Sequence, residues 1–125
     1  MLGKSLVVPT LPVVDLDRAK KFYLETLGLT VDSEDEWGTM LACGGGTKLL
    51  LYPRGATRAD HTVASFEVDD VEAAVAELRA KGVVFQEYDQ PGLKTENGVA
   101  TAGESKAAWF LDPEGNILAL GSSPD

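Results

Sequence analysis

The stretch VVDLDRAKKFYLETLGL, residues 13–29, changes from a strand pattern to a helix pattern and back again. In its middle the apolar residues recur at helical spacing, with lysine, arginine and glutamate on the opposite face. Asp15 or Asp17 can supply the oxygen that caps the first turn, and Gly28 stands where a helix ends in the left-handed conformation. The stretch therefore predicts one helix between two strands.

Immediately before this stretch, and after it as far as residue 53, the sequence predicts strands only. Residues 6–14 are apolar, and the prolines within them are typical of an edge or bulged strand. Three strand-like runs follow the helix, at about residues 29–34, 37–43 and 48–53. Gly44-Gly45-Gly46 separates the last two runs and predicts a tight hairpin turn.

After a linker at residues 55–60 the same order of elements begins again. Residues 62–68 predict a strand, residues 70–81 a helix ended by Gly82, and residues 83–88 another strand. The stretch 90–106 is rich in Gly, Thr, Glu and Asn, and we expect a long loop with a short strand near Val99. Loops of this length are often functional, so this loop is a candidate lid. Two final strands, 107–111 and 117–120, flank the turn sequence Asp112-Pro113-Glu114-Gly115-Asn116.

An internal repeat relates the two parts of the chain. Adding 55 to a residue number maps the apolar and capping positions of the first strand and helix onto those of the second. The glycines that end the two helices, Gly28 and Gly82, need a slip of one residue. The second helix should therefore be one residue shorter than the first. We expect a single domain over residues 1–125, with halves at about 1–54 and 61–125.

Composition limits the function classes. The chain has 125 residues, one cysteine, and 11 basic against 20 acidic residues, for a formal net charge of −9. This sign is wrong for nucleic acid or an anionic membrane as partner, but it suits a cationic ligand. A single cysteine excludes an internal disulfide and a cysteine cage for metal. No apolar run approaches a membrane span, and we predict a cytoplasmic protein.

Three motifs resemble the vicinal oxygen chelate superfamily, which includes glyoxalases, bleomycin-resistance proteins and extradiol dioxygenases. They occur in the expected order: the stretch 13–29, then Phe66-Glu67-Val68-Asp69-Asp70-Val71, then Phe110-Leu111-Asp112-Pro113-Glu114-Gly115-Asn116. The resemblance implies an α+β fold of two βαβββ modules that form a cupped mixed sheet, with the helices on its outer face. It also implies a homodimer, since members commonly dimerise. Members include both metal-dependent enzymes and metal-free antibiotic-binding proteins, so the fold alone does not define the function.

The resemblance also indicates where a metal would be held. Enzymatic members place histidine or glutamate at strand positions that correspond here to Val8, Val63 and Ala119. None of these side chains can bind a metal, and we predict no catalytic metal and no cofactor. The weak alternative is His61, the only histidine, which a bulge or register slip could bring toward the cup. Its partner would be Glu67, which is distant for one ion.

Strand alternation predicts which side chains line the cup. Alternate residues of the first strand, the fifth strand and the last two strands should face the helices, and their neighbours should face the ligand. Trp37 and Tyr52 can join from the middle strands. The predicted ligand-binding residues are Thr10, Trp37, Tyr52, Val63, Ser65, Glu67, Trp109 and Ala119.

Two hypotheses for function follow. The first is a metal-free protein that binds or sequesters a small, partly aromatic, possibly cationic compound, with tryptophan and tyrosine as stacking surfaces. The second is an enzyme of the same superfamily: a metal-dependent lyase or dioxygenase with displaced ligands, or a catalyst that uses Glu67 as a base. Whether the chain is an enzyme stays open at this point. Cys43 lacks a basic neighbour that would activate it as a nucleophile.

Overall fold

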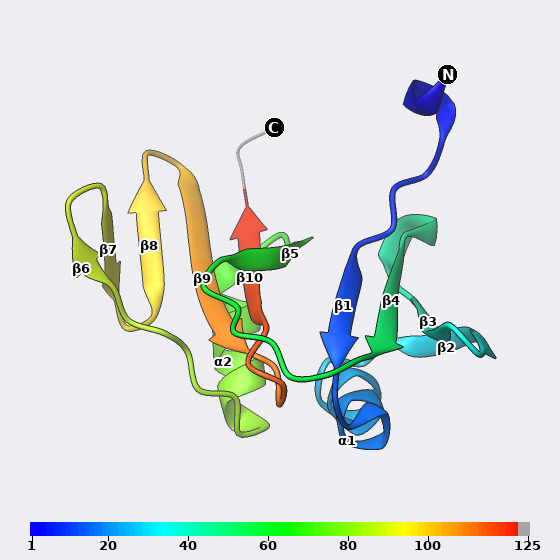
Figure 1. Cartoon of the computed structure of the whole chain (residues 1–125). Helices are drawn as coiled ribbons and strands as arrows, with labels where there is room; N and C mark the ends of the chain where they lie inside the picture. Colours follow the sequence, from blue (N-terminus) through cyan, green and yellow to red (C-terminus); the bar gives the residue numbers. More distant parts are fainter. Residues whose placement is uncertain (123–125) are drawn as a thin grey trace. The chain divides into compact units, whose positions relative to one another are not determined.

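The computed structural model describes residues 1–122, and the chain packs as two compact units (Figure 1). Unit one is Met1–Thr57, and unit two begins at Arg58. Whether the two units act as one domain stays a prediction. No helix within residues 1–122 combines the length and the hydropathy that a membrane span requires.

Unit one is a four-stranded mixed sheet with one helix. Its strand order is β1-β4-β3-β2, in which β1 runs parallel to β4 and the other pairs are antiparallel. In Figure 1, β1 and β4 lie side by side. The elements are η1 (Leu2–Lys4), β1 (Thr10–Val13), α1 (Leu16–Lys21), η2 (Phe22–Thr26), β2 (Thr30–Asp35), β3 (Gly38–Ala42), η3 (Gly44–Gly46) and β4 (Lys48–Pro53).

Unit two repeats this plan and adds a hairpin. Its six-stranded sheet has the order β5-β10-β9-β8-β7-β6, and β5 runs parallel to β10 as β1 does to β4. Without β6 and β7 the order of elements is βαβββ in both units. The internal repeat of the sequence therefore corresponds to two copies of one structural unit. The elements are β5 (Thr62–Glu67), α2 (Val71–Ala80), β6 (Asp89–Gln90), β7 (Leu93–Glu96), β8 (Val99–Ala102), β9 (Ser105–Leu111) and β10 (Ile117–Ser122).

The two helices begin as the sequence predicts. An Asp15 carboxylate oxygen accepts the backbone N–H of Arg18 at 3.1 Å, and Asp70 accepts that of Ala73 at 3.0 Å. Each oxygen satisfies a donor that the first helical turn leaves unpaired. Gly28 and Gly82 follow the helices with φ of +80° and +92°, a conformation that glycine adopts without strain.

The first helix is longer by one residue because its last turn is a π-turn. The helical segments α1 and η2 together cover residues 16–26, whereas α2 covers residues 71–80. In the π-turn the N–H of Leu27 donates to the carbonyl of Phe22, five residues earlier, at 3.1 Å. A turn closed over five residues holds one more residue than an α-turn. The one-residue slip between the repeats is located here.

Each unit buries its apolar residues between its helix and one face of its sheet. In unit one, Leu11, Val13 and Leu51 of the sheet are buried, as are Ala19 and Tyr23 of the helical segment. The matching buried set in unit two is Val71, Val75, Ala108, Phe110, Leu118 and Leu120. Phe66 and Val68, also predicted to face the helix, are only half-buried. Phe66 pairs with Leu120 and so shares its face, but β5 is an edge strand with a neighbour on one side only.

Two sequence predictions about strands are wrong in extent. The first strand forms only from Thr10, and Leu6 and Val7 before it are exposed. The segment 83–88, predicted as a strand, makes a single bridge between Phe85 and Phe110.

The predicted loop at 90–106 is instead a β-meander, in which β8 confirms the short strand expected near Val99. It contains β7, β8 and the start of β9, and Gln90 at its beginning is the last residue of β6. The turns between these strands are Pro91-Gly92, Asn97-Gly98 and Gly103-Glu104. Asn97 and Gly98 both have positive φ, at +54° and +82°, which is the backbone of a type I′ hairpin. The lid hypothesis is therefore abandoned, because hydrogen-bonded strands replace the loop on which it rested.

Gly38 marks the closest backbone approach in unit one. A Cβ added there would lie 2.0 Å from the carbonyl oxygen of Leu51 on the neighbouring strand, and its φ is +143°. We expect Gly38→Ala to lower the free energy of unfolding by about 3 kcal/mol or more, because overpacking and backbone strain add. Urea denaturation measures this change. Gly55→Ala, which meets nothing within 4 Å, is the control and should change it by less than about 0.5 kcal/mol. Equal midpoints for the two variants would contradict the prediction.

Candidate functional site

The face of the unit-two sheet opposite α2, termed here the open face, brings together four of the predicted ligand-binding residues. Ala119 on β10 pairs with Ser65 on β5 and with Trp109 on β9. Directly paired residues of neighbouring strands point to the same side of a sheet. Glu67 occupies the next such row, where it pairs with Gly121. The register thus confirms the shared face, whereas the ligand-binding role of these residues stays a prediction.

Trp109 has an aromatic partner on the open face that the sequence analysis missed. The ring of Tyr88 lies edge-on to the indole, with centroids 5.5 Å apart and planes at 89°. Both residues are half-buried, so part of each ring remains accessible. The backbone N–H of Gln86 donates to the Trp109 carbonyl at 2.7 Å and holds this segment beside β9.

A buried hydroxyl fixes Tyr88 in place. Thr95, which is 8% exposed, accepts the Tyr88 N–H with its Oγ1 at 2.8 Å and donates its own N–H to the Tyr88 carbonyl at 2.8 Å. The same hydroxyl lies 2.5 Å from the Glu87 carboxylate, which also accepts the Gly98 N–H at 3.0 Å. These hydrogen bonds, with the Thr95 bond the stronger cause, lower the pKa of Glu87 and keep it charged. The hydrogen bonds of Thr95 and Glu87 therefore hold the backbone of Tyr88, and with it the aromatic pair.

In unit one the predicted residues divide between two environments. Thr10 pairs with Leu50, and Pro12 with Tyr52, one residue away from the buried pair Leu11 and Leu51. Thr10 and Tyr52 therefore lie on the sheet face opposite α1, as predicted. Trp37 does not, because it lies in the turn between β2 and β3 and is 73% exposed. The prediction that it joins from a strand is wrong.

The positions at which the resemblance places metal ligands are aliphatic and lie on or next to strands. Val8 precedes β1, Val63 is at an irregularity in the pairing of β5, and Ala119 is buried in β10. None carries an atom that coordinates a metal. Within residues 1–122, no three His, Cys, Asp or Glu side chains are grouped closely enough to hold an ion.

His61 and Glu67 do not form a substitute site. His61 precedes β5, its side chain is 73% exposed, and its Nδ1 lies 3.2 Å from an Asp60 carboxylate oxygen. Glu67 is the last residue of β5. The five steps from Thr62 to Glu67 alone span about 16 Å of extended chain, so the two side chains cannot share one ion. Simple alternation would place His61 and Val63 on one face, but the pairing irregularity at this end of β5 interrupts the alternation.

The two candidate catalytic groups lack an activating environment. Glu67 is exposed, whereas a carboxylate that serves as a base at neutral pH is usually buried. Burial raises the pKa of the Cys43 thiol, which lowers the fraction of the reactive thiolate.

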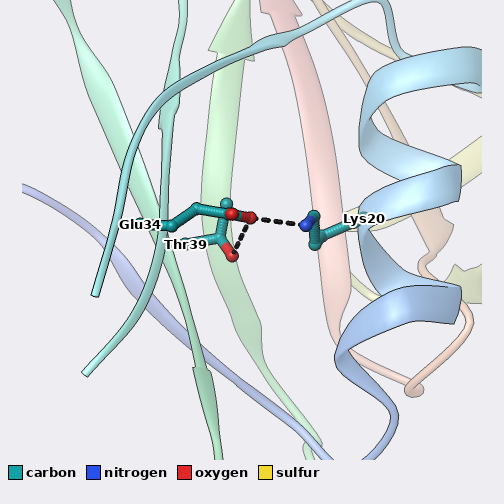
Figure 2. Close-up of polar contacts among 3 residues, drawn as sticks. All are labelled: Lys20, Glu34 and Thr39. Carbon is teal, nitrogen blue, oxygen red and sulfur yellow. Dashed lines mark hydrogen bonds and ion pairs between the residues drawn. The ribbon is translucent and has the colours of Figure 1, made fainter. Parts of the chain in front are cut away.

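The helix side of unit one carries an ion pair rather than a binding site (Figure 2). The Lys20 ammonium on α1 contacts the Glu34 carboxylate on β2, which also accepts the buried Thr39 hydroxyl at 3.1 Å. The hydrogen bond from Lys20, with that from Thr39, lowers the pKa of Glu34, and the same contact raises the pKa of Lys20. The pair ties the helix to the edge strand β2.

The fold and its surfaces define a class of protein, a mixed α+β chain of two βαβββ units with a parallel strand pair in each. The chain belongs to the Glyoxalase/Bleomycin resistance protein/Dioxygenase superfamily, whose family model matches residues 5–120. This confirms the family resemblance that the sequence motifs indicate.

Individual relatives include both an enzyme and a binding protein. The chain is 29% identical over 124 residues to the glutathione transferase FosA of Serratia marcescens, covering 94% of this chain and 79% of that protein. It is 28% identical to TnmS3, an antibiotic binding protein from Streptomyces sp. CB03234, with a TM-score of 0.67 and coverage of 97% and 98%. A superfamily member from Sphaerobacter thermophilus gives a TM-score of 0.76 at 20% identity, with coverage of 98% and 100%, and shows the fold alone.

The Lys20–Glu34 pair gives stability a defined pH dependence. The pKa of Glu34 is lowered on folding, so its contribution is present above its ordinary pKa of about 4.3 and is lost as pH falls through the folded value. The pKa of Lys20 is raised, so its contribution is present below about 10.4 and is lost as pH rises through the folded value.

We therefore expect Glu34→Gln to lower the Tm slightly at pH 7, and the difference from the wild type to narrow as the pH falls below about 4. Thermal unfolding followed by circular dichroism between pH 3 and pH 8 measures it. Glu36→Gln, in the adjacent turn, is the control for lost charge. A difference that stays constant down to pH 3 would contradict the assignment.

Proposed function

We propose that the chain binds a small, partly aromatic molecule on the open face of unit two. The observation that carries this proposal is the Tyr88–Trp109 pair, two half-buried rings held edge-on beside the predicted residues Ser65 and Ala119. Aromatic surface supplies contact area at low entropic cost, and a few polar groups fix orientation.

The relief of the open face supports the same function. Strand β10, between β5 and β9, presents Ala119 and Gly121 there, with Ser65 and Glu67 on one side and Trp109 on the other. Both of these β10 residues are small, so they do not project past the neighbouring indole. A planar ring can therefore lie over β10 against Trp109, with the Ser65 hydroxyl as a hydrogen-bonding group.

Charge favours a cationic compound. Glu67 is exposed on the open face, and the whole chain has a formal net charge of −9. Long-range attraction and a local carboxylate both favour a positive ligand. The antibiotic binding protein TnmS3 is one relative whose described role agrees with sequestration of a small molecule. A homodimer and a cytoplasmic location stay predictions.

The alternative is an enzyme, a metal-dependent lyase or dioxygenase with displaced ligands. The similarity to a glutathione transferase is the observation that favours a catalytic member of the superfamily. Against it stand the aliphatic side chains of Val8, Val63 and Ala119 and the separation of His61 from Glu67. We therefore propose the binding function.

Tryptophan fluorescence tests binding on the open face. In Trp37→Phe, where Trp109 is the only indole, we expect saturable quenching by N-methylacridinium and weaker quenching by neutral 1,4-dihydroxyanthraquinone. Adding Tyr88→Leu should weaken the apparent affinity about five- to tenfold, because the edge-to-face support of the indole is lost.

Phe22→Leu is the matched control for Tyr88→Leu, since it removes a half-buried ring from unit one. Circular dichroism establishes that both variants are folded. Equal affinities for the two, or the absence of saturation with both dyes, would contradict the proposal. Equal quenching by both dyes would contradict only the preference for a cation.

The metal content of the protein distinguishes the proposed binding function from the metal-dependent enzyme. Purified protein analysed by mass spectrometry should contain less than one metal ion per ten chains, and added Zn²⁺ or Mn²⁺ should not raise the Tm. An ion bound to the folded state at 100 times its Kd would add about 2.7 kcal/mol to stability. Stoichiometric metal whose stabilisation disappears in His61→Ala would establish the enzyme alternative instead.

A further inference from the structure

A groove of about 590 Å³ lies within unit two, between α2 and the strands β7, β8 and β9. It is on the sheet face that α2 covers, because Val99 and Thr101 of β8 line it, and Thr101 pairs with Lys106, beside the buried Ala108. The open face is the opposite one, so the groove is separate from the proposed aromatic site. Its lining is Glu72, Val75, Ala76, Arg79, Lys94, Glu96, Asn97, Val99, Thr101 and Lys106.

Both ends of the groove are fixed by contacts to α2. At one end the Arg79 guanidinium donates to the Asn97 side-chain oxygen at 3.1 Å and to the Asn97 carbonyl at 3.0 Å. The same guanidinium lies over the Phe85 ring, 5.6 Å from its centroid. At the other end Lys106 of β9 pairs with Glu72 of α2. These contacts join α2 to the strands on the other side of the groove.

The groove concentrates positive charge in an acidic chain. Three of its ten lining residues are basic and two are acidic, whereas the whole chain has 11 basic and 20 acidic residues. Lys106 is paired with Glu72, but Lys94 forms no ion pair with any residue from 1 to 122. Glu96 is the other carboxylate in the lining.

Arg79 keeps donors available to a ligand. A guanidinium has five N–H donors, and the two bonds to Asn97 use two of them. Asn97 is neutral, and the Glu87 carboxylate that interacts with Arg79 electrostatically already accepts hydrogen bonds from Thr95 and Gly98. A carboxylate or phosphate, with two oxygens that match the guanidinium fork, is the group that such a fork and a nearby ammonium bind best.

We propose that this groove binds the carboxylate or phosphate group of a small molecule, with Lys94 and Arg79 as its cationic contacts. The apolar side chains of Val75, Ala76 and Val99 contact the body of the molecule. Thr101 adds a hydroxyl, which can donate to or accept from the ligand. The site is independent of the aromatic site on the open face.

Two-dimensional ¹H–¹⁵N NMR on the whole chain tests this site with three probes of one shape: benzoate, phenyl phosphate and neutral benzyl alcohol. We expect the two anions to give saturable shifts at the amides of Lys94, Asn97, Thr101 and Lys106, and benzyl alcohol to give none. If one anion binds more tightly, its charged group, carboxylate or phosphate, is the one that the groove prefers. Equal affinities mean that the groove recognises the oxyanion in either form.

Lys94→Met should weaken anion binding about fivefold or more, since it removes a cation that forms no ion pair with residues 1–122. Lys21→Met, on the exposed surface of unit one, is the matched control for lost charge and should leave binding unchanged. Shifts confined to Ser65 and Trp109 on the open face, no saturation by 50 mM of either anion, or equal affinities of the two lysine variants would each overturn the proposal. None of these results affects the fluorescence quenching by the aromatic dyes. The groove and the aromatic site are therefore tested independently.

Discussion

The turn Asn97-Gly98 is held from two sides, by the Arg79 guanidinium and by the Glu87 carboxylate, and both faces of unit two depend on it. Arg79 binds the Asn97 oxygens, which fixes a wall of the groove. Glu87 binds the Gly98 N–H and the Thr95 hydroxyl, and Thr95 in turn positions Tyr88 beside Trp109. Residue 98 has a φ of +82°, and a Cβ there would lie 2.8 Å from the Arg79 guanidinium and 3.1 Å from the Cβ of Phe85, so glycine suits this position best. One turn thereby organises two surfaces.

Much of the fold could be predicted from the sequence because its signals are local. The helix caps Asp15 and Asp70, the closing glycines and the alternation of strand residues each act over a few residues, and the structure confirms them. Of the β6–β8 meander the sequence predicts only the short strand near Val99, which is β8, because the glycines between the strands are also typical of a loop. Asn97-Gly98 between the short strands β7 and β8 was the available hairpin signal. Those strands carry no apolar alternation, so the pattern on which strand prediction relies was absent.

The candidate site was predictable only where register follows from alternation. Side chains alternate between the two faces along a strand. Ser65, Ala119 and Trp109 share a face because each lies next to a residue of its own strand that faces the helix. Tyr88 reaches Trp109 through a segment that forms no regular strand, and no local pattern specifies that approach. Trp37 was misplaced because one residue decides between a strand end and a turn. Long-range packing, rather than propensity, determines such positions.

The π-turn at the end of the first helix shows where a duplicated module tolerates a change of length. An extra residue in a strand would reverse every side chain beyond it, exchanging core and surface. In the helical segment the same residue widens one turn, and β2 still begins after Gly28 as the second module continues after Gly82. Two copies of one ancestral module can therefore drift apart in length at this helix end while their sheets retain a common register.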